Sequence, residues 1–244
     1  AASYARVSWR SAWCKTHFPA EFMAAVLAGW GGYYSQRVYL SEARRMGLTV
    51  RPPHINHASS DFAVCRVNEQ KVLFMGLDQV KDLGRRTIDR VLRLRPFASL
   101  EDFLTRVDPR PQEAQALVRA GALDGLGRIP DMLERLQQGR WQAGQMSLFG
   151  WEAGSAEDWS AEQKSAAQVE LLGISLEAHP LELAAGRIAA SGAMNTLEAA
   201  ARVGQHVTVA GVRQSSHRSQ TARGEAMLFL TLEDLHGALD VIVF

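Results

Sequence analysis

The feature that most constrains the fold is a pattern of helix, glycine-containing turn and helix, which occurs twice between residues 77 and 138. In the first copy, apolar residues at helical spacing predict short helices over 77–83 and 87–94, with Gly84 between them. In the second copy, helices expected over 113–120 and 130–138 flank a connection from Gly121 to Gly127. Another helix, Ser99–Val107, begins at a serine suited to cap it. The pattern predicts two helical hairpins in tandem.

The first hairpin carries most of the positive charge of the chain. Residues 81–95 contain six basic and two acidic residues, whereas the formal net charge of the whole chain is only +1. We expect Gly84 to allow a tight turn, and the helix after it to present free N–H groups to a phosphate. The residues predicted to contact a nucleic-acid backbone are Lys81, Gly84, Arg85, Arg86 and Arg90 in the first copy and Gly125, Gly127 and Arg128 in the second. Two ordinary helical corners with solvated arginines are the alternative, but two copies so close together favour non-specific phosphate binding.

The rest of the chain changes from helical to strand periodicity. Further helices are expected over residues 1–30 with a break near Pro19, over 35–46 with Gly47 as C-cap, over 160–172 and over 197–202. Residues 49–53 should be extended, and residues 72–75 should form a strand. From Val207 onward, apolar residues alternate and predict three strands, at 207–209, 228–232 and 239–243, the last two joined by a turn at 234–237. The expected fold class is mainly α, followed by a small β domain.

Residues 139–160 are the best candidate for a linker, because glycines interrupt them repeatedly. They contain the peptide Gln145-Met146-Ser147-Leu148-Phe149. An exposed Leu-Phe pair is unfavourable unless a partner buries it, at about 1.5–3 kcal/mol per side chain. The peptide therefore fits a groove on another protein, or else folds back onto its own domain.

Several chemistries find no support in the residues. The two cysteines, Cys14 and Cys65, form no Cys-x-x-Cys pair, which argues against a zinc knuckle or a disulfide scaffold and fits a reducing cytosol. We interpret His54 and His57 as surface residues and not metal ligands, because no carboxylate or thiol accompanies them. No signal peptide or membrane-length apolar run is visible. We predict no metal, no membrane partner and a cytoplasmic location.

Several motifs, in the same order, resemble bacterial C-family DNA polymerase III alpha subunits. They are Trp13–Leu27, Ser41–Leu48, Arg51-Pro52-Pro53-His54-Ile55-Asn56, the tandem hairpins, and Leu171–Leu181. His54 departs from the family pattern, which usually has an acid after the double proline. The resemblance covers nearly the whole chain and implies five segments. These are the end of the fingers domain (1–70), a tandem helix-hairpin-helix module that binds duplex DNA (71–138), a linker with a sliding-clamp-binding peptide (139–160), a helical connector (161–205), and the N-terminal part of an OB-fold domain (206–244).

The resemblance also assigns expected roles. Gln145 to Phe149 would bind the sliding clamp. In the OB-type domain, single-stranded DNA contacts are expected in and beside the loop between the first two strands, from Arg213, His217, Arg218 and Arg223. Arg10, Lys15 and His17 lie near where the fingers of the family face the incoming nucleotide, although a helix surface is an equally good interpretation. Other replisome subunits are implied partners.

No catalytic residue is expected in this chain. Two-metal nucleotidyl transfer needs clustered carboxylates, but the chain has no Asp-x-Asp pair, and Glu101-Asp102 and Glu233-Asp234 are better interpreted as structural. The resemblance places the catalytic palm, and the Mg²⁺ of the complete enzyme, upstream of Ala1, and implies that the chain is a fragment with an incomplete OB barrel. Two alternatives remain open: the same region of an error-prone translesion paralogue, and a stand-alone DNA-binding adaptor.

Overall fold

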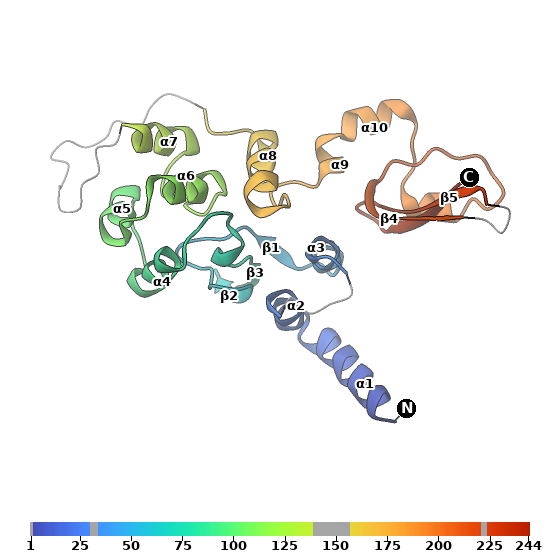
Figure 1. Cartoon of the computed structure of the whole chain (residues 1–244), viewed down its shortest axis with the longest axis horizontal. Coiled ribbons are helices and arrows are strands. Elements are labelled where there is room, and N and C mark those ends of the chain that lie inside the picture. The colour runs from blue at the N-terminus through green and yellow to red at the C-terminus, as the bar shows by residue number, and fades with distance from the viewer. Residues whose placement is uncertain (1, 30–33, 139–156, 221–223) are drawn as a thin grey trace. The chain divides into compact units, whose positions relative to one another are not determined.

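The computed structural model describes residues 2–29, 34–138, 157–220 and 224–244. The chain divides into two compact units, unit 1 (Ala1–Glu177) and unit 2 (Ala178–Phe244), which Figure 1 draws in blue to yellow and in orange to red. The division falls inside the stretch 161–205 that we assigned to a connector. The prediction of a mainly α chain followed by a small β region is confirmed.

Unit 1 begins with three helices, α1 (Ala2–His17), α2 (Pro19–Ala28) and α3 (Gln36–Arg45). Pro19 is the first residue of α2, where its missing N–H costs nothing, so the predicted break between α1 and α2 is confirmed. Gly47 follows α3 with φ +77°, which a residue with a Cβ rarely adopts. It therefore ends the helix as expected.

A small mixed sheet follows these helices. Strand β3 (Gln70–Phe74) lies between β1 (Thr49–Arg51), which is parallel to it, and β2 (Ala63–Val67), which is antiparallel. The expected extended segment and the strand near Val72 are confirmed. Strand β2 was not predicted, because its half-buried residues give no clear alternation.

The remaining elements of unit 1 are η1 (Leu77–Gln79), α4 (Arg85–Leu94), α5 (Leu100–Val107), α6 (Pro111–Arg119), α7 (Ile129–Gln137) and α8 (Ala161–Leu172). The predicted helix over 77–83 is wrong, because only its first three residues form a single 3₁₀ turn. Val80 is extended, and Asp82 has φ +62°, which an α-helix cannot accommodate. The first hairpin therefore reverses direction at Asp82 and not at Gly84.

Unit 1 has one continuous hydrophobic core. It joins the α2–α3 region to the sheet and to both hairpins, through buried residues that include Met23, Leu40, Leu73, Val91, Phe103, Leu117 and Leu123. The assigned boundary at residues 70/71 lies at the start of β3, the central strand of the sheet. The hairpins are thus anchored on the same core as the segment before them.

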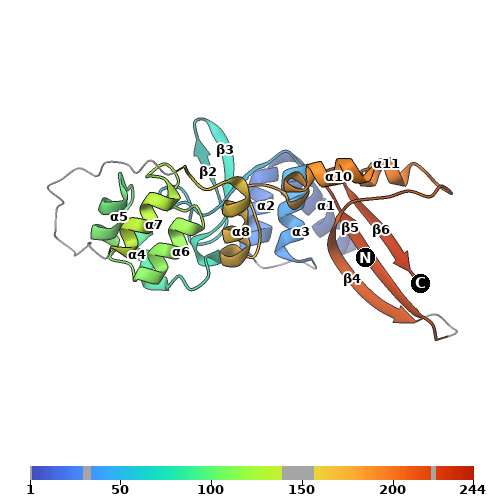
Figure 2. The same cartoon turned by 90° about the horizontal axis from the view of Figure 1, so that it is seen from above.

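Unit 2 contains three short helices and an antiparallel sheet. The helices are α9 (Pro180–Leu183), α10 (Ala185–Ser191) and α11 (Thr196–Ala200), and the strands are β4 (Val212–Gln220), β5 (Ala226–Glu233) and β6 (Ala238–Val243). Figure 2 shows the three strands side by side, in the order β4-β5-β6. The Asp234 carboxylate accepts the N–H groups of His236 and Gly237 at the predicted β5–β6 turn, and both the N–H and the hydroxyl of Thr196 in α11. The interpretation of Asp234 as structural is confirmed.

The predicted position of the first strand of unit 2 is wrong. The strand begins at Val212, whereas Val209 makes only an isolated bridge to Met194. Strand β5 ends at Glu233, which pairs with Val212, so earlier residues have no β5 partner. Most residues of β4 are polar and exposed, and for that reason period-two alternation did not reveal it. No helix among the described residues is long and apolar enough to cross a membrane.

Candidate nucleic-acid interface

The first hairpin presents three basic side chains to solvent. Lys81 precedes the turn, and Arg85 and Arg86 are the first two residues of α4. The Arg85 Nε lies 3.2 Å from Asp89 Oδ1, and an Arg86 nitrogen lies 3.3 Å from Asp108 Oδ2. The two arginine side chains are 72% and 64% exposed, so both guanidinium groups remain accessible to an external anion.

Arg90, from the same helix, has a different role. It is half-buried, and its guanidinium donates a 2.8 Å hydrogen bond to the backbone carbonyl of Arg106. This bond directs one nitrogen of the guanidinium toward α5 instead of solvent. The structure therefore places Arg90 between α4 and α5, away from the exposed group formed by Lys81, Arg85 and Arg86.

A carboxylate of the chain itself occupies the position where we expected a phosphate. Glu113, which is 5% exposed, accepts the N–H of Gly84 at 2.9 Å and the Thr87 hydroxyl at 2.8 Å. It also accepts the N–H of Arg110, at 2.8 Å, at the beginning of α6. The expectation of a free Gly84 N–H is therefore wrong. One side chain ties the N-terminus of α4 to the N-terminus of α6, and so joins the two hairpins.

Glu113 is held ionised by these donors. Burial acts on its pKa more strongly than any other single effect and raises it, but the N–H groups of Arg110 and Gly84 and the Thr87 hydroxyl together outweigh burial. The pKa of Glu113 is therefore lowered from its ordinary value. Gly84 itself has an ordinary φ of −76°. A Cβ there would lie 2.8 Å from Glu113 Oε1, so an alanine would displace this oxygen from the Gly84 N–H.

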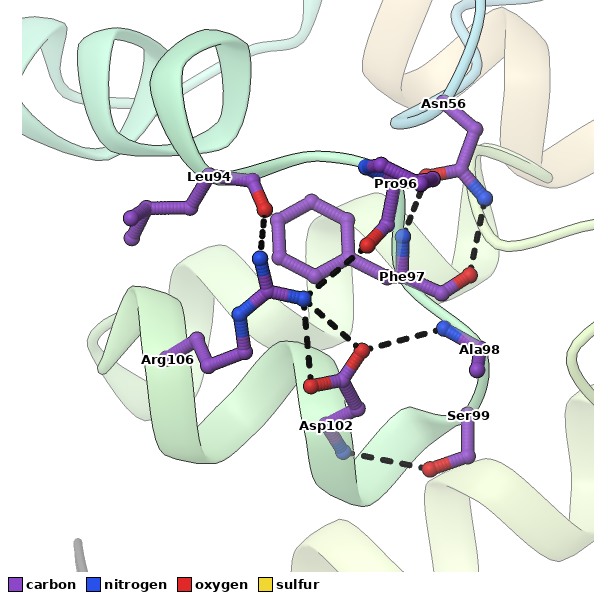
Figure 3. Close-up of polar contacts among 8 residues, drawn as sticks. All are labelled: Asn56, Leu94, Pro96, Phe97, Ala98, Ser99, Asp102 and Arg106. Carbon is purple, nitrogen blue, oxygen red and sulfur yellow. Dashed lines mark hydrogen bonds and ion pairs between the residues drawn. The ribbon is translucent and has the colours of Figure 1, made fainter.

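The segment between α4 and α5 is fixed by Arg106, as Figure 3 shows. Its guanidinium donates to the carbonyls of Leu94 and Pro96 and to both oxygens of Asp102, and lies 5.0 Å from the centre of the Phe97 ring. Asn56 holds the backbone of Phe97 from the other side, through both its N–H and its carbonyl. The predicted N-cap of α5 is confirmed, since Ser99 accepts the N–H of Asp102 at 3.1 Å. The orientation of α4 relative to α5 is thus determined by several bonds.

The second hairpin, α6 and α7, has a similar carboxylate at its second helix. Asp158 Oδ1 accepts the Ile129 N–H at 3.0 Å, at the beginning of α7, and Asp158 Oδ2 pairs with Lys164 at 2.8 Å. Burial raises the pKa of Asp158, but Lys164 and the backbone N–H groups of Ile129 and Trp159 outweigh it, so the pKa is lowered. Gly125 has φ +80°, as a tight turn requires, and the Arg128 Nε lies 3.2 Å from Asp131 Oδ2.

The other predicted site residues are placed as follows. Arg10 and His17 are exposed on α1, where the His17 ring lies tilted against Trp13 with centroids 4.6 Å apart. Lys15 pairs with Glu42 of α3 at 2.8 Å. Arg213, His217 and Arg218 lie within β4, so the expected loop position is wrong, although their side chains are exposed. Arg223 and the peptide Gln145–Phe149 lie outside the described residues.

One of the two histidines that we expected at the surface, His54, differs from that position, whereas His57 is exposed as expected. His54 is half-buried: its Nε2 lies 3.0 Å from the Asp124 carbonyl, and its Nδ1 accepts the Asn56 N–H at 3.1 Å. Its ring packs 4.6 Å from the ring of His57, which is exposed. Across the described ranges, no group of three or more histidine, cysteine or acidic side chains could hold a metal ion.

Comparison with known proteins agrees with this architecture. A family model described as a helix-hairpin-helix motif matches residues 47–132. The chain is 31% identical to DNA polymerase III subunit alpha of Deinococcus radiodurans over 280 residues, which cover 100% of the chain and 21% of the relative. It is 32% identical to DNA polymerase III subunit alpha of Pasteurella multocida, covering 100% of the chain and 23% of that protein.

An error-prone DNA polymerase of Corynebacterium efficiens is as similar, with 32% identity over 99% of the chain and 22% of the relative. The chain thus spans less than a quarter of the length of each of these three relatives. The similarity is equal for the two kinds of polymerase, so it does not separate the replicative alternative from the translesion one. Over nearly its whole length, the chain therefore aligns with one segment of these DNA polymerase III alpha subunits and of this error-prone DNA polymerase.

Proposed function

We propose that this chain holds duplex DNA, without sequence preference, as the DNA-binding part of a bacterial DNA polymerase. The observation that carries the proposal is the exposed group Lys81, Arg85 and Arg86 on a helix-hairpin-helix hairpin. Arginine and lysine side chains bind phosphate oxygens, which carry no sequence information. The group would therefore position the duplex and not read its bases.

The existing ion pairs of the arginines do not prevent this role. Exposed salt bridges such as Arg85–Asp89 and Arg86–Asp108 are worth about 0–1 kcal/mol. A phosphate can replace the aspartate at little cost, and the release of counterions from DNA then favours binding. Because Glu113 and Asp158 occupy N–H groups at the beginnings of α4 and α7, side chains and not these N–H groups would provide most of the grip.

Within the polymerase, we expect this chain to bind DNA and not to catalyse nucleotide addition. The chain has no Asp-x-Asp pair, so we propose that the carboxylates that hold Mg²⁺ belong to another part of the complete cytoplasmic enzyme. Purified alone, the chain should show no template-directed synthesis, in primer extension with Mg²⁺ and all four nucleotides. Extension by the purified chain would contradict this assignment.

The duplex proposal is tested with Arg85→Ala/Arg86→Ala. Fluorescence anisotropy on a labelled duplex should show weaker binding on every sequence. The slope of the logarithm of the binding constant against the logarithm of salt concentration should become shallower by about two. The matched control is Arg187→Ala/Arg202→Ala, which removes two exposed arginines from unit 2. Loss confined to one sequence, or an equal loss in the control, would overturn the proposal.

A second proposed partner is the sliding clamp, through Gln145–Phe149. The support is the peptide itself and its position after the hairpins, as the resemblance to the family implies. Leu148→Ala/Phe149→Ala should abolish association with a purified clamp in surface plasmon resonance. The control Met146→Ala should retain measurable binding. Unchanged affinity in the double variant would remove the clamp, and with it this link to other replisome subunits.

A third proposed contact is single-stranded DNA on β4 of unit 2, as expected for an OB-type domain. Arg213, His217 and Arg218 are exposed on that strand, and His217 pairs with Phe229 of β5, which is 39% exposed. Arg213 and Arg218 pair with Leu232 and Leu228, whose side chains lie on the other face of the sheet from Phe229. An exposed aromatic ring beside a histidine suits a stacked, unpaired base. Phe229→Ala should weaken binding of an oligothymidylate about five-fold or more in the anisotropy assay, and an unchanged affinity would contradict the contact.

A further inference from the structure

Unit 1 contains a cavity of about 400 Å³ that the duplex-binding proposal does not use. It is lined by the β1–β3 sheet and the loop after β1, by the connection between α6 and α7, and by α8. It shares Gly127 with the second hairpin, but none of Lys81, Arg85 and Arg86 lines it. Its volume lies within the range of small-molecule sites, roughly 300–1,000 Å³.

One wall of the cavity is aromatic. The rings of His57 and Phe74 stack with centroids 5.6 Å apart and an interplanar angle of 26°, and the His54 ring lies 4.6 Å from His57. The His54 pKa is lowered, mainly by burial, so this ring is neutral at physiological pH. His57 is exposed, and its ring forms no hydrogen bond within the described residues. The wall therefore offers aromatic ring faces for stacking.

The opposite side carries a buried amide with an unused donor. Gln168 of α8 is 2% exposed. Its Oε1 accepts the N–H groups of Leu176 at 2.7 Å and Glu177 at 3.0 Å, but its Nε2 donates to no group within the part of the chain that the structure describes. The N–H groups of Nε2 are therefore left to donate to an acceptor outside the chain. An external acceptor in the cavity would satisfy it.

The charge of the lining selects the kind of ligand. Three cationic side chains (Arg51, Arg119, Lys164) face three carboxylates (Asp124, Asp158, Glu177), so the lining is balanced. Arg119 pairs with Glu170, and Lys164 pairs with Asp158. The Asp124 carboxylate accepts no hydrogen bond among the described residues and is free to accept one from a ligand. A polyanion finds no excess of positive charge here, whereas a neutral ring with both acceptors and N–H donors is complementary.

We propose that this cavity binds an unpaired nucleobase, stacked on His57 and donating to Asp124, with a ring acceptor on the Gln168 amide. The base can come from a free nucleoside or from a single DNA strand. The site is distinct from the duplex grip, and its existence does not depend on that grip.

The first test titrates the whole chain with each deoxynucleoside by calorimetry. It also measures the anisotropy of a labelled single strand, against a strand of the same length with abasic sites. Gln168→Glu keeps the oxygen that accepts from Leu176 and Glu177 but removes the donor, and should weaken base binding about ten-fold. His57→Ala removes the stacking wall and should weaken it at least five-fold. The control is His206→Ala, an exposed histidine of unit 2, which should leave binding unchanged.

The outcomes distinguish a free nucleoside from a base on a DNA strand, and they distinguish the base-binding proposal from the duplex-binding proposal. Weaker nucleoside binding in both cavity variants supports a free ligand. An effect seen only on the base-containing strand supports a base delivered by DNA. If neither cavity variant changes either affinity, the cavity is not a base site. Duplex affinity is measured in parallel: it should be retained in Gln168→Glu and lost in Arg85→Ala/Arg86→Ala, so failure of one proposal leaves the other standing.

Discussion

The two hairpins of unit 1 use the same backbone arrangement but present different surfaces. In both, a carboxylate from elsewhere in the sequence accepts an N–H at the beginning of the second helix, Glu113 for α4 and Asp158 for α7. The first hairpin adds two highly exposed arginines, whereas Arg128 of the second pairs with Asp131, whose side chain is 13% exposed. The comparison indicates that these N–H groups serve the fold, and that surface arginines distinguish the hairpin that we propose to bind DNA.

Removing the two carboxylates should show the largest difference in stability between the hairpins. Glu113→Ala leaves the N–H groups of Gly84 and Arg110 and the Thr87 hydroxyl without an acceptor, and should lower the free energy of unfolding by about 3 kcal/mol. Asp158→Ala leaves the N–H groups of Ile129 and Trp159 and a partly exposed lysine, and should cost about 1 kcal/mol. Urea unfolding followed by circular dichroism measures both. Equal losses of stability in the two variants would contradict the role of Glu113 in joining the two hairpins.

Glycine substitutions test whether space or backbone conformation matters in each hairpin. In Gly84→Ala the new Cβ would lie 2.8 Å from Glu113 Oε1, so we expect a loss of about 2 kcal/mol. In Gly125→Ala the Cβ meets nothing within 4 Å, but φ is +80°, and strain should cost about 1 kcal/mol. The same unfolding assay applies. A larger loss of stability in Gly125→Ala than in Gly84→Ala would show that backbone strain at Gly125 outweighs the steric contact at Gly84.

The pH dependence of stability should carry opposite contributions from two carboxyl groups. The pKa of Glu113 is lowered in the fold, so its contribution is present above the unfolded pKa and is lost as pH falls through the folded one. The pKa of Asp78 is raised, mainly by burial and also by Asp61, so its contribution is present at low pH and is lost as pH rises through the folded pKa.

Isosteric variants isolate these two contributions. Thermal unfolding measured from pH 3 to pH 8 should show that Glu113→Gln removes part of the acid-side loss, whereas Asp78→Asn removes part of the loss on raising pH. A pH profile that neither variant alters would contradict both assignments.

The smallest expected effects are those of the surface ion pairs. Asp89→Ala/Asp108→Ala removes the ion-pair partners of Arg85 and Arg86, and with them two negative charges beside the proposed phosphate-binding side chains. Stability should change by less than about 0.5 kcal/mol, while duplex affinity at low salt should rise two- to five-fold. On the second hairpin, Asp131→Ala should leave duplex affinity within about two-fold. Tighter binding in Asp131→Ala alone would move the DNA grip to the second hairpin.

Local signals in the sequence were sufficient for most elements, because their causes are local. Pro19 begins α2, Ser99 caps α5, and Ser160 caps α8 through the N–H of Gln163. The basic face of the first hairpin was also readable, since exposed arginines on a short helix need no distant partner.

What escaped prediction depends on distant or unusual contacts. The acceptor for the Gly84 N–H is 29 residues away, at Glu113. The only local sign was an acid in the first turn of α6, which is typical of an ordinary cap. The 3₁₀ turn η1 depends on the left-handed Asp82, a conformation that aspartate adopts only occasionally. Strand β4 pairs through its backbone while exposing polar side chains, so its residues show no alternation.

Because Glu113 contacts both α4 and α6, the two hairpins should not open independently. Exposure of the Gly84 amide to solvent deuterium requires release of a carboxylate that also holds the Arg110 amide. Local opening at either helix start therefore removes protection from the other. The two amides should exchange at matched rates, as members of one cooperative opening unit, so the paired hairpins would grip or release a duplex together.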